Sequence, residues 1–177
     1  MVWNIMVLRR GKIKFDIMYY YFKQEITTES VNNLIEKLEQ ADGVINLYFS
    51  TNGGNSASMS FLISFFNSIA NKLTITLTND VWSAGTQILY DFKGKIKLDL
   101  DELDSILFHS TDRETFNFRK DSTICDEKIL VRQDKEYNLK VAEKIKKKGL
   151  LTDKQLKDFL KGKDVVVYKE QFKNWTL

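Results

Sequence analysis

The order of strand patterns and helix patterns between residues 44 and 92 constrains the fold of this chain more than any other feature. Ile45, Leu47 and Phe49 alternate with polar neighbours, and this period of two predicts a strand. The predicted elements of this segment are a strand at 44–50, a helix at 57–69, a strand at 73–78 and a helix at 86–92. Such alternation predicts parallel βαβ units with right-handed crossovers, and therefore an α/β protein.

Further elements are predicted on both sides of this segment. Thr27 or Thr28 can cap a helix, because a threonine oxygen accepts a hydrogen bond from the free N–H groups of the first turn, and Gly43 is expected to end it. The remaining elements are a hairpin at about 1–15, strands at 17–22, 95–98, 105–109 and 164–168, a long helix at about 126–148 stopped by Gly149, and a helix at 152–160. The long helix is expected to present an apolar face made of Leu130, Tyr137, Val141 and Ile145.

Composition limits the classes of function. The chain has 177 residues, enough for a single domain over residues 1–177 with a full core. The single cysteine, Cys125, and the single histidine, His109, argue against a disulfide framework and a Cys/His zinc site, so no metal or other cofactor is expected. A net charge of +3 is too small to predict nucleic-acid binding. The chain has no apolar run long enough to span a membrane and no signal-peptide pattern, so a cytoplasmic protein is expected.

Two loops are candidates for a functional site, because ligands of α/β folds bind beyond the carboxyl ends of strands. Gly53-Gly54 follows the strand at 44–50 and permits a close approach of substrate to the main chain. Ser83-Ala84-Gly85 precedes a helix, in a turn that can expose a hydroxyl beside the next backbone N–H. The alternatives are an ordinary βα turn for the glycines and a helix N-cap for Ser83.

His109 stands at the end of the apolar run Ile106-Leu107-Phe108. A serine becomes a nucleophile at neutral pH only beside a base, and within one subunit this histidine is the one available imidazole. The alternative is a structural histidine at the end of a strand.

These residues in this order resemble the Clp protease proteolytic subunit family, which has a crotonase-like fold. INLYFSTNGGN resembles the strand and paired glycines of that family, VWSAGTQILYDFKGK resembles its nucleophile turn, and ILFHS resembles the run into its histidine. The spacings, 29 residues from Gly54 to Ser83 and 26 from Ser83 to His109, agree with the family to within one residue. The resemblance covers about residues 13–177, and it is strong from 44 to 110.

The resemblance implies a crotonase-like βαβ superhelical core with a long protruding helix before the C-terminal helix and strand. It also implies a serine endopeptidase with a Ser83–His109–Asp164 triad. Asp126, Asp134, Asp153 and Asp158 are other aspartates after the long helix begins, and a shift of one residue would place Lys163 at the position of Asp164. Departures from the family pattern are Asn52 before the glycines, Trp82 before the nucleophile and Ser110-Thr111 after the histidine.

The resemblance further implies an oxyanion hole formed by the N–H groups of Gly54 and Ala84, with Gly53 and Asn55 binding substrate. The implied substrate is a peptide or an unfolded protein, cleaved inside a homo-oligomeric chamber of rings. The helix at 126–148 would join the rings, and a separate AAA+ unfoldase would dock near the N-terminal hairpin. The alternatives are a catalytically inactive assembly subunit and an acyl-CoA-processing enzyme of the same fold.

Overall fold

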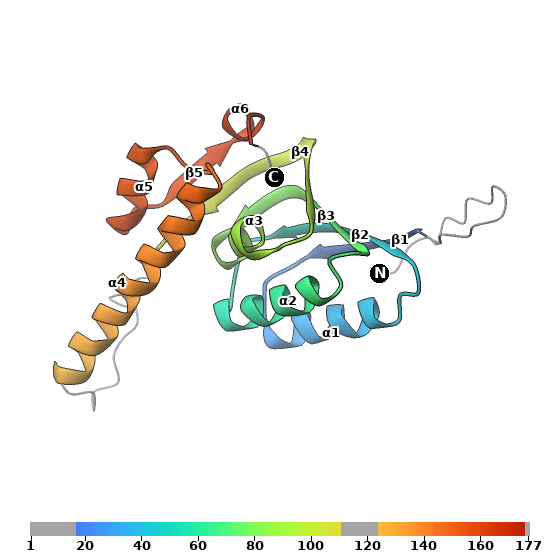
Figure 1. The fold of residues 1–177 in the computed structure, drawn as a ribbon, viewed down its shortest axis with the longest axis horizontal. Coiled ribbons are helices and arrows are strands. Elements are labelled where there is room, and N and C mark those ends of the chain that lie inside the picture. Colours follow the sequence, from blue (N-terminus) through green and yellow to red (C-terminus); the bar gives the residue numbers. More distant parts are fainter. Residues whose placement is uncertain (1–16, 111–123, 176–177) are drawn as a thin grey trace. The chain divides into compact units, whose positions relative to one another are not determined.

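A computed structural model describes residues 17–110 and 124–175, so the predicted hairpin at 1–15 lies outside the described residues. The chain divides into two compact units, the first with residues up to Leu107 together with Val167–Trp175, and the second with Phe108–Val166. The elements, coloured along the sequence in Figure 1, are β1 (Ile17–Lys23), α1 (Thr28–Glu39), β2 (Val44–Thr51), α2 (Ser56–Ser68), β3 (Leu73–Trp82), the 3₁₀ turn η1 (Ser83–Thr86), α3 (Gln87–Asp91), β4 (Lys95–Phe108), α4 (Ile124–Lys147), α5 (Asp153–Leu160), β5 (Val165–Tyr168) and α6 (Lys169–Phe172).

The predicted α/β class is confirmed. The strands form one sheet in the order β1-β2-β3-β4-β5, in which β1 to β4 are parallel. Each crossover moves to the next strand in the same direction, so right-handed connections place their helices on the same face of the sheet. Figure 1 shows α1 and α2 side by side on that face, and the hydroxyls of Thr28 and Ser58 join the two helices at 3.2 Å.

The start of α1 was predicted correctly from the sequence, and its end was not. Thr27 caps the helix: its hydroxyl accepts from the N–H of Ser30 at 3.0 Å, and the Ser30 hydroxyl accepts from the N–H of Thr27 at 2.9 Å. The helix ends at Glu39 rather than at Gly43. The N–H of Ala41 donates to the carbonyl of Leu38 at 3.2 Å, so a tightened last turn ends the helix before the glycine.

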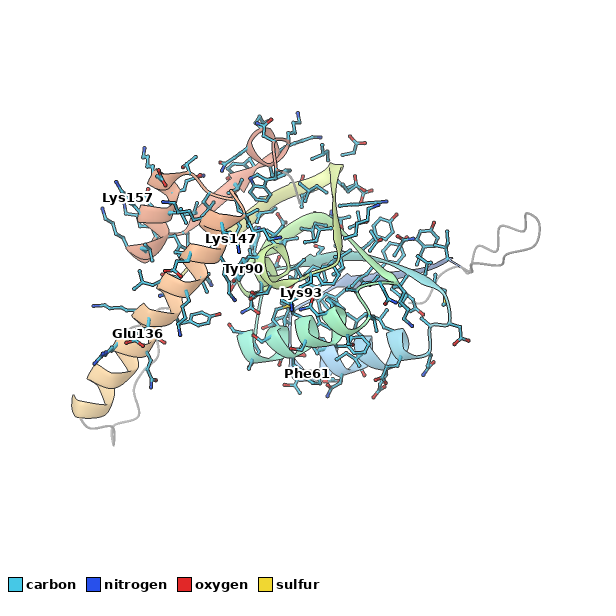
Figure 2. The ribbon with its side chains drawn as sticks, in the orientation of Figure 1. Phe61, Tyr90, Lys93, Glu136, Lys147 and Lys157 are labelled. Carbon is cyan, nitrogen blue, oxygen red and sulfur yellow. The ribbon has the colours of Figure 1, made fainter. Side chains whose placement is uncertain are left out.

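The core lies between the sheet and these helices. Ile45, Leu47 and Phe49 are 0% exposed, as their alternation predicts, and α2 contributes buried residues of its own. Phe61, in contrast, is 58% exposed on the outer surface of α2 (Figure 2). Burying a side chain of the size of Ile, Leu or Phe stabilises a fold by roughly 1.5–3 kcal/mol. Ile45, Leu47 and Phe49 together therefore contribute substantially to the stability of the fold.

The prediction of a loop from Asp80 onward was wrong, because β3 continues to Trp82. The β2–β3 register moves from Phe49↔Leu77 to Thr51↔Val81, so β3 carries extra residues here. Asn79 takes a positive φ of 51°, a backbone conformation that asparagine tolerates better than most residues. After this bulge the strand pairs with β4 again, and the turn to the next helix begins only at Ser83.

The two strands predicted at 95–98 and 105–109 are one irregular strand, β4. Its register against β3 jumps from Leu98 to Leu103. The side chain of Asp99 stabilises the excursion, since its Oδ1 accepts from the N–H groups of Asp101 at 3.2 Å and Glu102 at 3.4 Å. A bulge therefore divides each of β3 and β4 into a segment before the bulge and a segment after it.

The second unit contains the long helix, which is observed as α4 close to its predicted bounds. Val141 and Ile145 are buried as expected, whereas Tyr137 is 43% exposed and Asp134 is buried instead. Gly149, at a φ of +64°, ends the helical segment as predicted. Figure 2 shows Glu136 and Lys147 on α4 and Lys157 on α5.

No helix in the part of the chain that the structure describes is long and apolar enough to cross a membrane.

Candidate active site

The glycine loop after β2 is held by the chain that follows β1. The N–H of Ile26 donates to the carbonyl of Gly53, and the N–H of Asn55 donates to the carbonyl of Ile26, both at 2.8 Å. Gly54 faces Ile26 in this parallel bridge, so its own N–H and C=O point to the opposite side. Gly54 has a φ of +134°, and a Cβ there would overlap the carbonyl oxygen of Ile26, so glycine is required.

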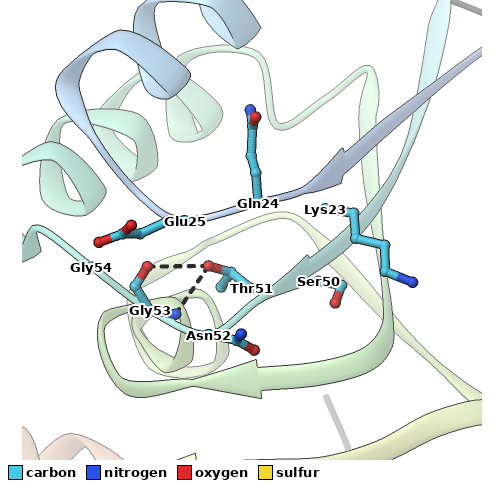
Figure 3. A pocket seen from close by; sticks show the side chains of 8 residues that line it. All are labelled: Lys23, Gln24, Glu25, Ser50, Thr51, Asn52, Gly53 and Gly54. Carbon is cyan, nitrogen blue, oxygen red and sulfur yellow. Dashed lines mark hydrogen bonds between the residues drawn. The ribbon is translucent and has the colours of Figure 1, made fainter. Parts of the chain in front are cut away.

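A buried threonine holds the neighbouring glycine. Thr51 is 3% exposed. Its hydroxyl accepts from the N–H of Gly53 at 3.0 Å and donates to the carbonyl of Gly53 at 3.3 Å, as drawn in Figure 3. These bonds fix Gly53 at a φ of +100°, a conformation that L side chains rarely adopt.

Ser83 occupies a strained backbone position at the turn from β3 into η1. Its φ is +53°, and the other positive-φ residue besides glycine among the described residues is Asn79. Trp82 is the N-cap of η1 and makes no side-chain cap bond, so Ser83 is not the N-cap that the alternative interpretation required. The carbonyl of Ser83 accepts from the Thr86 hydroxyl at 2.7 Å. Strain of this kind persists only where the surrounding structure holds it, and it is concentrated at functional sites.

The structure brings the two predicted loops together. A Cβ built on Gly53 would lie 2.6 Å from the Cβ and 3.1 Å from the Oγ of Ser83, which is closer than side chains approach. The same Cβ would lie 3.2 Å from the carbonyl oxygen of Trp82. The missing side chain of Gly53 is therefore what lets the glycine loop touch the serine turn.

Gly85 serves a related purpose on the other side of the turn. A Cβ on Gly85 would overlap the Cγ2 of Thr51, the residue that holds Gly53. The spacing Ser-x-Gly thus places Ser83 in contact with Gly53 and Gly85 in contact with Thr51. The turn is fixed from below as well, because Ser60 of α2 donates to the buried Gln87 of α3 at 3.2 Å.

A pocket of about 320 Å³ opens where β1 and β2 end (Figure 3). It is lined by Lys23, Gln24, Glu25, Ser50, Thr51, Asn52, Gly53 and Gly54. Figure 3 shows the Lys23 and Glu25 side chains on opposite sides of it, so a cation and an anion frame a polar space. Gly53 belongs both to this pocket and to the contact with Ser83, so the pocket borders the glycine loop that touches the serine turn.

Asn55 was predicted to bind substrate, and its side chain has a structural task in addition. Its Oδ1 accepts from the N–H of Ser58 at 2.8 Å and caps α2. Lys23, Gln24 and Glu25 were not predicted as site residues. They lie at the end of β1 and directly after it, and ligands of α/β folds bind beyond the carboxyl ends of strands, so the end of this strand is the signal that points to them.

The second unit brings His109 and Asp164 together. His109 follows β4 directly and Asp164 precedes β5 directly. The Nδ1 of His109 lies 3.7 Å from the Oδ1 of Asp164, and the two side chains are 45% and 68% exposed. The distance is that of an ion pair longer than a hydrogen bond, and catalytic hydrogen bonds are often this long before substrate binds.

The other candidates for the third position are engaged elsewhere. Asp153 pairs with Lys146 at 3.5 Å. Asp158 pairs with Lys163 at 3.2 Å, so the one-residue shift would bring in a lysine that has its own carboxylate. The side chain of Asp126 lies outside the described residues, and Asp134 is buried on α4.

The described residues offer few other candidates for a metal site or for a titratable catalytic group. Within it, no group of three or more His, Cys, Asp or Glu side chains is arranged to hold a metal ion. Partial burial raises the pKa of Tyr20 and of Tyr48 above its usual value; both tyrosines lie within β1 and β2, away from the glycine loop.

No family model matches the chain, and no curated protein matches it.

Proposed function

We propose that this protein is a serine endopeptidase of the Clp protease type with a crotonase-like fold, in which Ser83 is the nucleophile. The observation that carries the proposal is the backbone of Ser83: a φ of +53° at a strand-to-helix turn, packed against the side-chain-free face of Gly53. An ordinary βα turn does not need this strain, whereas a nucleophile that must project its hydroxyl does.

In the proposed mechanism His109 takes the Ser83 proton as the hydroxyl attacks a peptide carbonyl, and then returns it to the leaving amine. Asp164 holds the imidazole by its Nδ1 and stabilises the positive charge that develops.

The oxyanion of the tetrahedral intermediate is proposed to bind the N–H groups of Gly54 and Ala84. The bridge to Ile26 uses the carbonyl of Gly53 and the N–H of Asn55, which leaves the N–H of Gly54 directed to the other side. Ala84 follows the nucleophile directly. Losing one such donor typically costs about 2.7–4 kcal/mol of transition-state stabilisation.

Labelling with a fluorophosphonate tests this proposal. The Ser83 oxygen displaces fluoride from phosphorus, and mass spectrometry locates the adduct on the serine. We expect labelling of wild type, none of Ser83→Ala, and wild-type labelling of Ser64→Ala, whose hydroxyl lies on the exposed side of α2. An unlabelled wild-type protein would contradict the proposal and favour a catalytically inactive subunit.

A second candidate is favoured by one observation. An acyl-CoA-processing enzyme of this fold uses a glutamate as acid or base, and neither Gly53-Gly54 nor Ser83-Ala84-Gly85 has a glutamate beside it in the sequence. Glu25, however, lines the pocket together with Gly53 and Gly54. Coenzyme A binding that is weakened in Glu25→Gln, together with a fluorophosphonate-resistant Ser83, is the result that selects this candidate.

Assembly into homo-oligomeric rings, feeding by an AAA+ unfoldase and a cytoplasmic location belong to the same proposal. The exposed side chains of Tyr137 and Leu139 on α4, at 43% and 52%, support a role of this helix in assembly. Size-exclusion chromatography with light scattering measures the mass. A monomer at all concentrations would contradict the ring assembly.

A further inference from the structure

Trp82, directly before the proposed nucleophile, is fixed by a chain of side-chain hydrogen bonds. Its indole Nε1 donates to the hydroxyl of Ser105 at 2.8 Å. That hydroxyl in turn donates to the Oδ1 of Asp80 at 2.6 Å. Ser105 is 6% exposed, whereas Trp82 and Asp80 are half-buried, so the central hydroxyl of this chain is the part most shielded from water. Asp80 lies in the bulge of β3, and Trp82 and Ser105 lie beyond the bulges of β3 and β4.

The same chain of contacts reaches β2. The hydroxyl of Ser50 donates to the backbone carbonyl of Asp80 at 3.2 Å. Asp80 lies in the bulge, where the β2–β3 register skips, so the side chain supplies a hydrogen bond that the ladder does not. Ser50 also lines the pocket described above. Side chains of three neighbouring strands therefore hold the four residues that lead into the serine turn.

These four residues need holding. Asn79, the first of them, and Ser83, which follows the last, both have a positive φ, at 51° and 53°. A segment with such a residue at each end is under strain, and the flanking backbone must be over-determined to maintain it. The carbonyl of Trp82 also abuts Gly53, so a movement of Trp82 would be transmitted directly to the contact between the glycine loop and Ser83.

We propose that Trp82 is a positioning residue: the Trp82–Ser105–Asp80 chain holds the backbone of Ser83 at its reactive angle, and this rests on the proposed function. The indole takes no part in bond making. It keeps the hydroxyl of Ser83 aligned, and small misalignments at a reacting atom can lower a rate by as much as about a hundredfold.

Trp82→Phe removes the indole N–H and keeps an aromatic ring, while Ser105→Ala removes the hydroxyl that links the other two. The matched control is Ser58→Ala, because Ser58 is a serine of the same unit, 9% exposed, whose hydroxyl bonds to Thr28 at 3.2 Å. Fluorophosphonate labelling gives a maximal rate and a half-saturating concentration for each variant. Urea unfolding of the same samples measures stability.

We expect Trp82→Phe and Ser105→Ala to lower the maximal labelling rate by about tenfold to a hundredfold at an unchanged half-saturating concentration. Ser58→Ala is expected to shift the urea midpoint about as much as Ser105→Ala, while its labelling rate stays at that of wild type. In ¹⁵N spectra the indole N–H of Trp82, assigned from its loss in Trp82→Phe, is expected to be protected from exchange in wild type and unprotected in Ser105→Ala.

The outcomes separate this inference from the proposed function. Labelling of Trp82→Phe and Ser105→Ala at the wild-type rate overturns the inference and leaves the endopeptidase proposal intact. An equal slowing in Ser58→Ala overturns it too, because the effect is then one of stability, and so does an unprotected indole in wild type. A wild-type protein that is not labelled overturns both.

Discussion

The two halves of the proposed triad are held in different ways. Ser83 lies between the buried residues Val81 and Ala84, and its unusual backbone angle is packed against Gly53. His109 and Asp164, in the other unit, are 45% and 68% exposed and meet across 3.7 Å. The proposed nucleophile is thus positioned by backbone and close packing, and the proposed base is paired with a carboxylate at the surface.

This difference separates what each half contributes to stability. An exposed ion pair stabilises a fold by about 0–1 kcal/mol at most, since water and salt screen it. A residue held in the left-handed region costs roughly 1–2 kcal/mol, which the surrounding contacts must offset. A substitution that relieves the strain at Ser83 should therefore raise stability while it removes activity. Substitutions at His109 or Asp164 should lower activity and leave stability almost unchanged.

The largest effect is expected at Ser83 itself. Ser83→Ala and Ser83→Gly both lose the hydroxyl and should lose all hydrolysis and labelling. Ser83→Gly should be more stable than Ser83→Ala by about 1 kcal/mol, because glycine adopts a positive φ without steric conflict. Urea unfolding of the two variants measures this difference directly.

Ser64 provides the control for that pair. It lies within α2, where glycine is less favourable than alanine by about 1 kcal/mol. The order of the glycine and alanine variants should therefore reverse between the two positions. The same order at both would show that Ser83 is not strained, and the contrast between the two halves would lose its basis.

The next effect concerns the aspartate. Asp164→Asn should lower the rate of peptide hydrolysis by about 10²–10⁴, because the amide no longer holds the imidazole in the tautomer that accepts a proton. Stability should change by less than about 0.5 kcal/mol, as expected for an exposed surface pair. Rates of hydrolysis and urea midpoints of the variant and wild type are the measurements.

Asp158→Asn is the matched variant in the same unit. It breaks the pair with Lys163 at 3.2 Å and should leave the rate at that of wild type. High salt is a further comparison: at 1 M the screening length is about 3 Å, and wild-type activity should fall by only a few-fold, because an exposed pair is worth about 0–1 kcal/mol and the carboxylate still fixes the tautomer. Equal rates for the two aspartate variants would remove Asp164 from the site.

Much of the fold follows from periodicity, and the exceptions share a cause. Ile45, Leu47 and Phe49 are buried because they alternate, and Thr27 caps α1 because its neighbours leave free N–H groups. The extension of β3 to Trp82 was missed, since it depends on pairing with β4 above two bulges. Pairing between segments far apart in the sequence leaves no local period to detect.

The site divides in the same way. The residue types and spacing pointed to Gly53, Ser83, His109 and Asp164, and the structure places the first two in contact and the last two within ion-pair distance. The hydrogen bonds of Thr51 and the link from Trp82 through Ser105 could not be predicted. They join side chains whose proximity is set by the register of the strands, and no motif marks them.

The last comparison is measured as stability alone and takes one glycine from each unit. Gly54→Ala should destabilise the fold by about 2–3 kcal/mol, because φ is +134° and the added Cβ overlaps the backbone of Ile26. Gly149→Ala should cost only about 1 kcal/mol, since φ is +64° and nothing lies within 4 Å of the added Cβ. Urea midpoints measure both. An equal loss of stability in the two variants would mean that the backbone at the bridge between Ile26 and Gly54 shifts easily to make room for a Cβ. A loop that shifts so easily cannot hold an oxyanion donor in place.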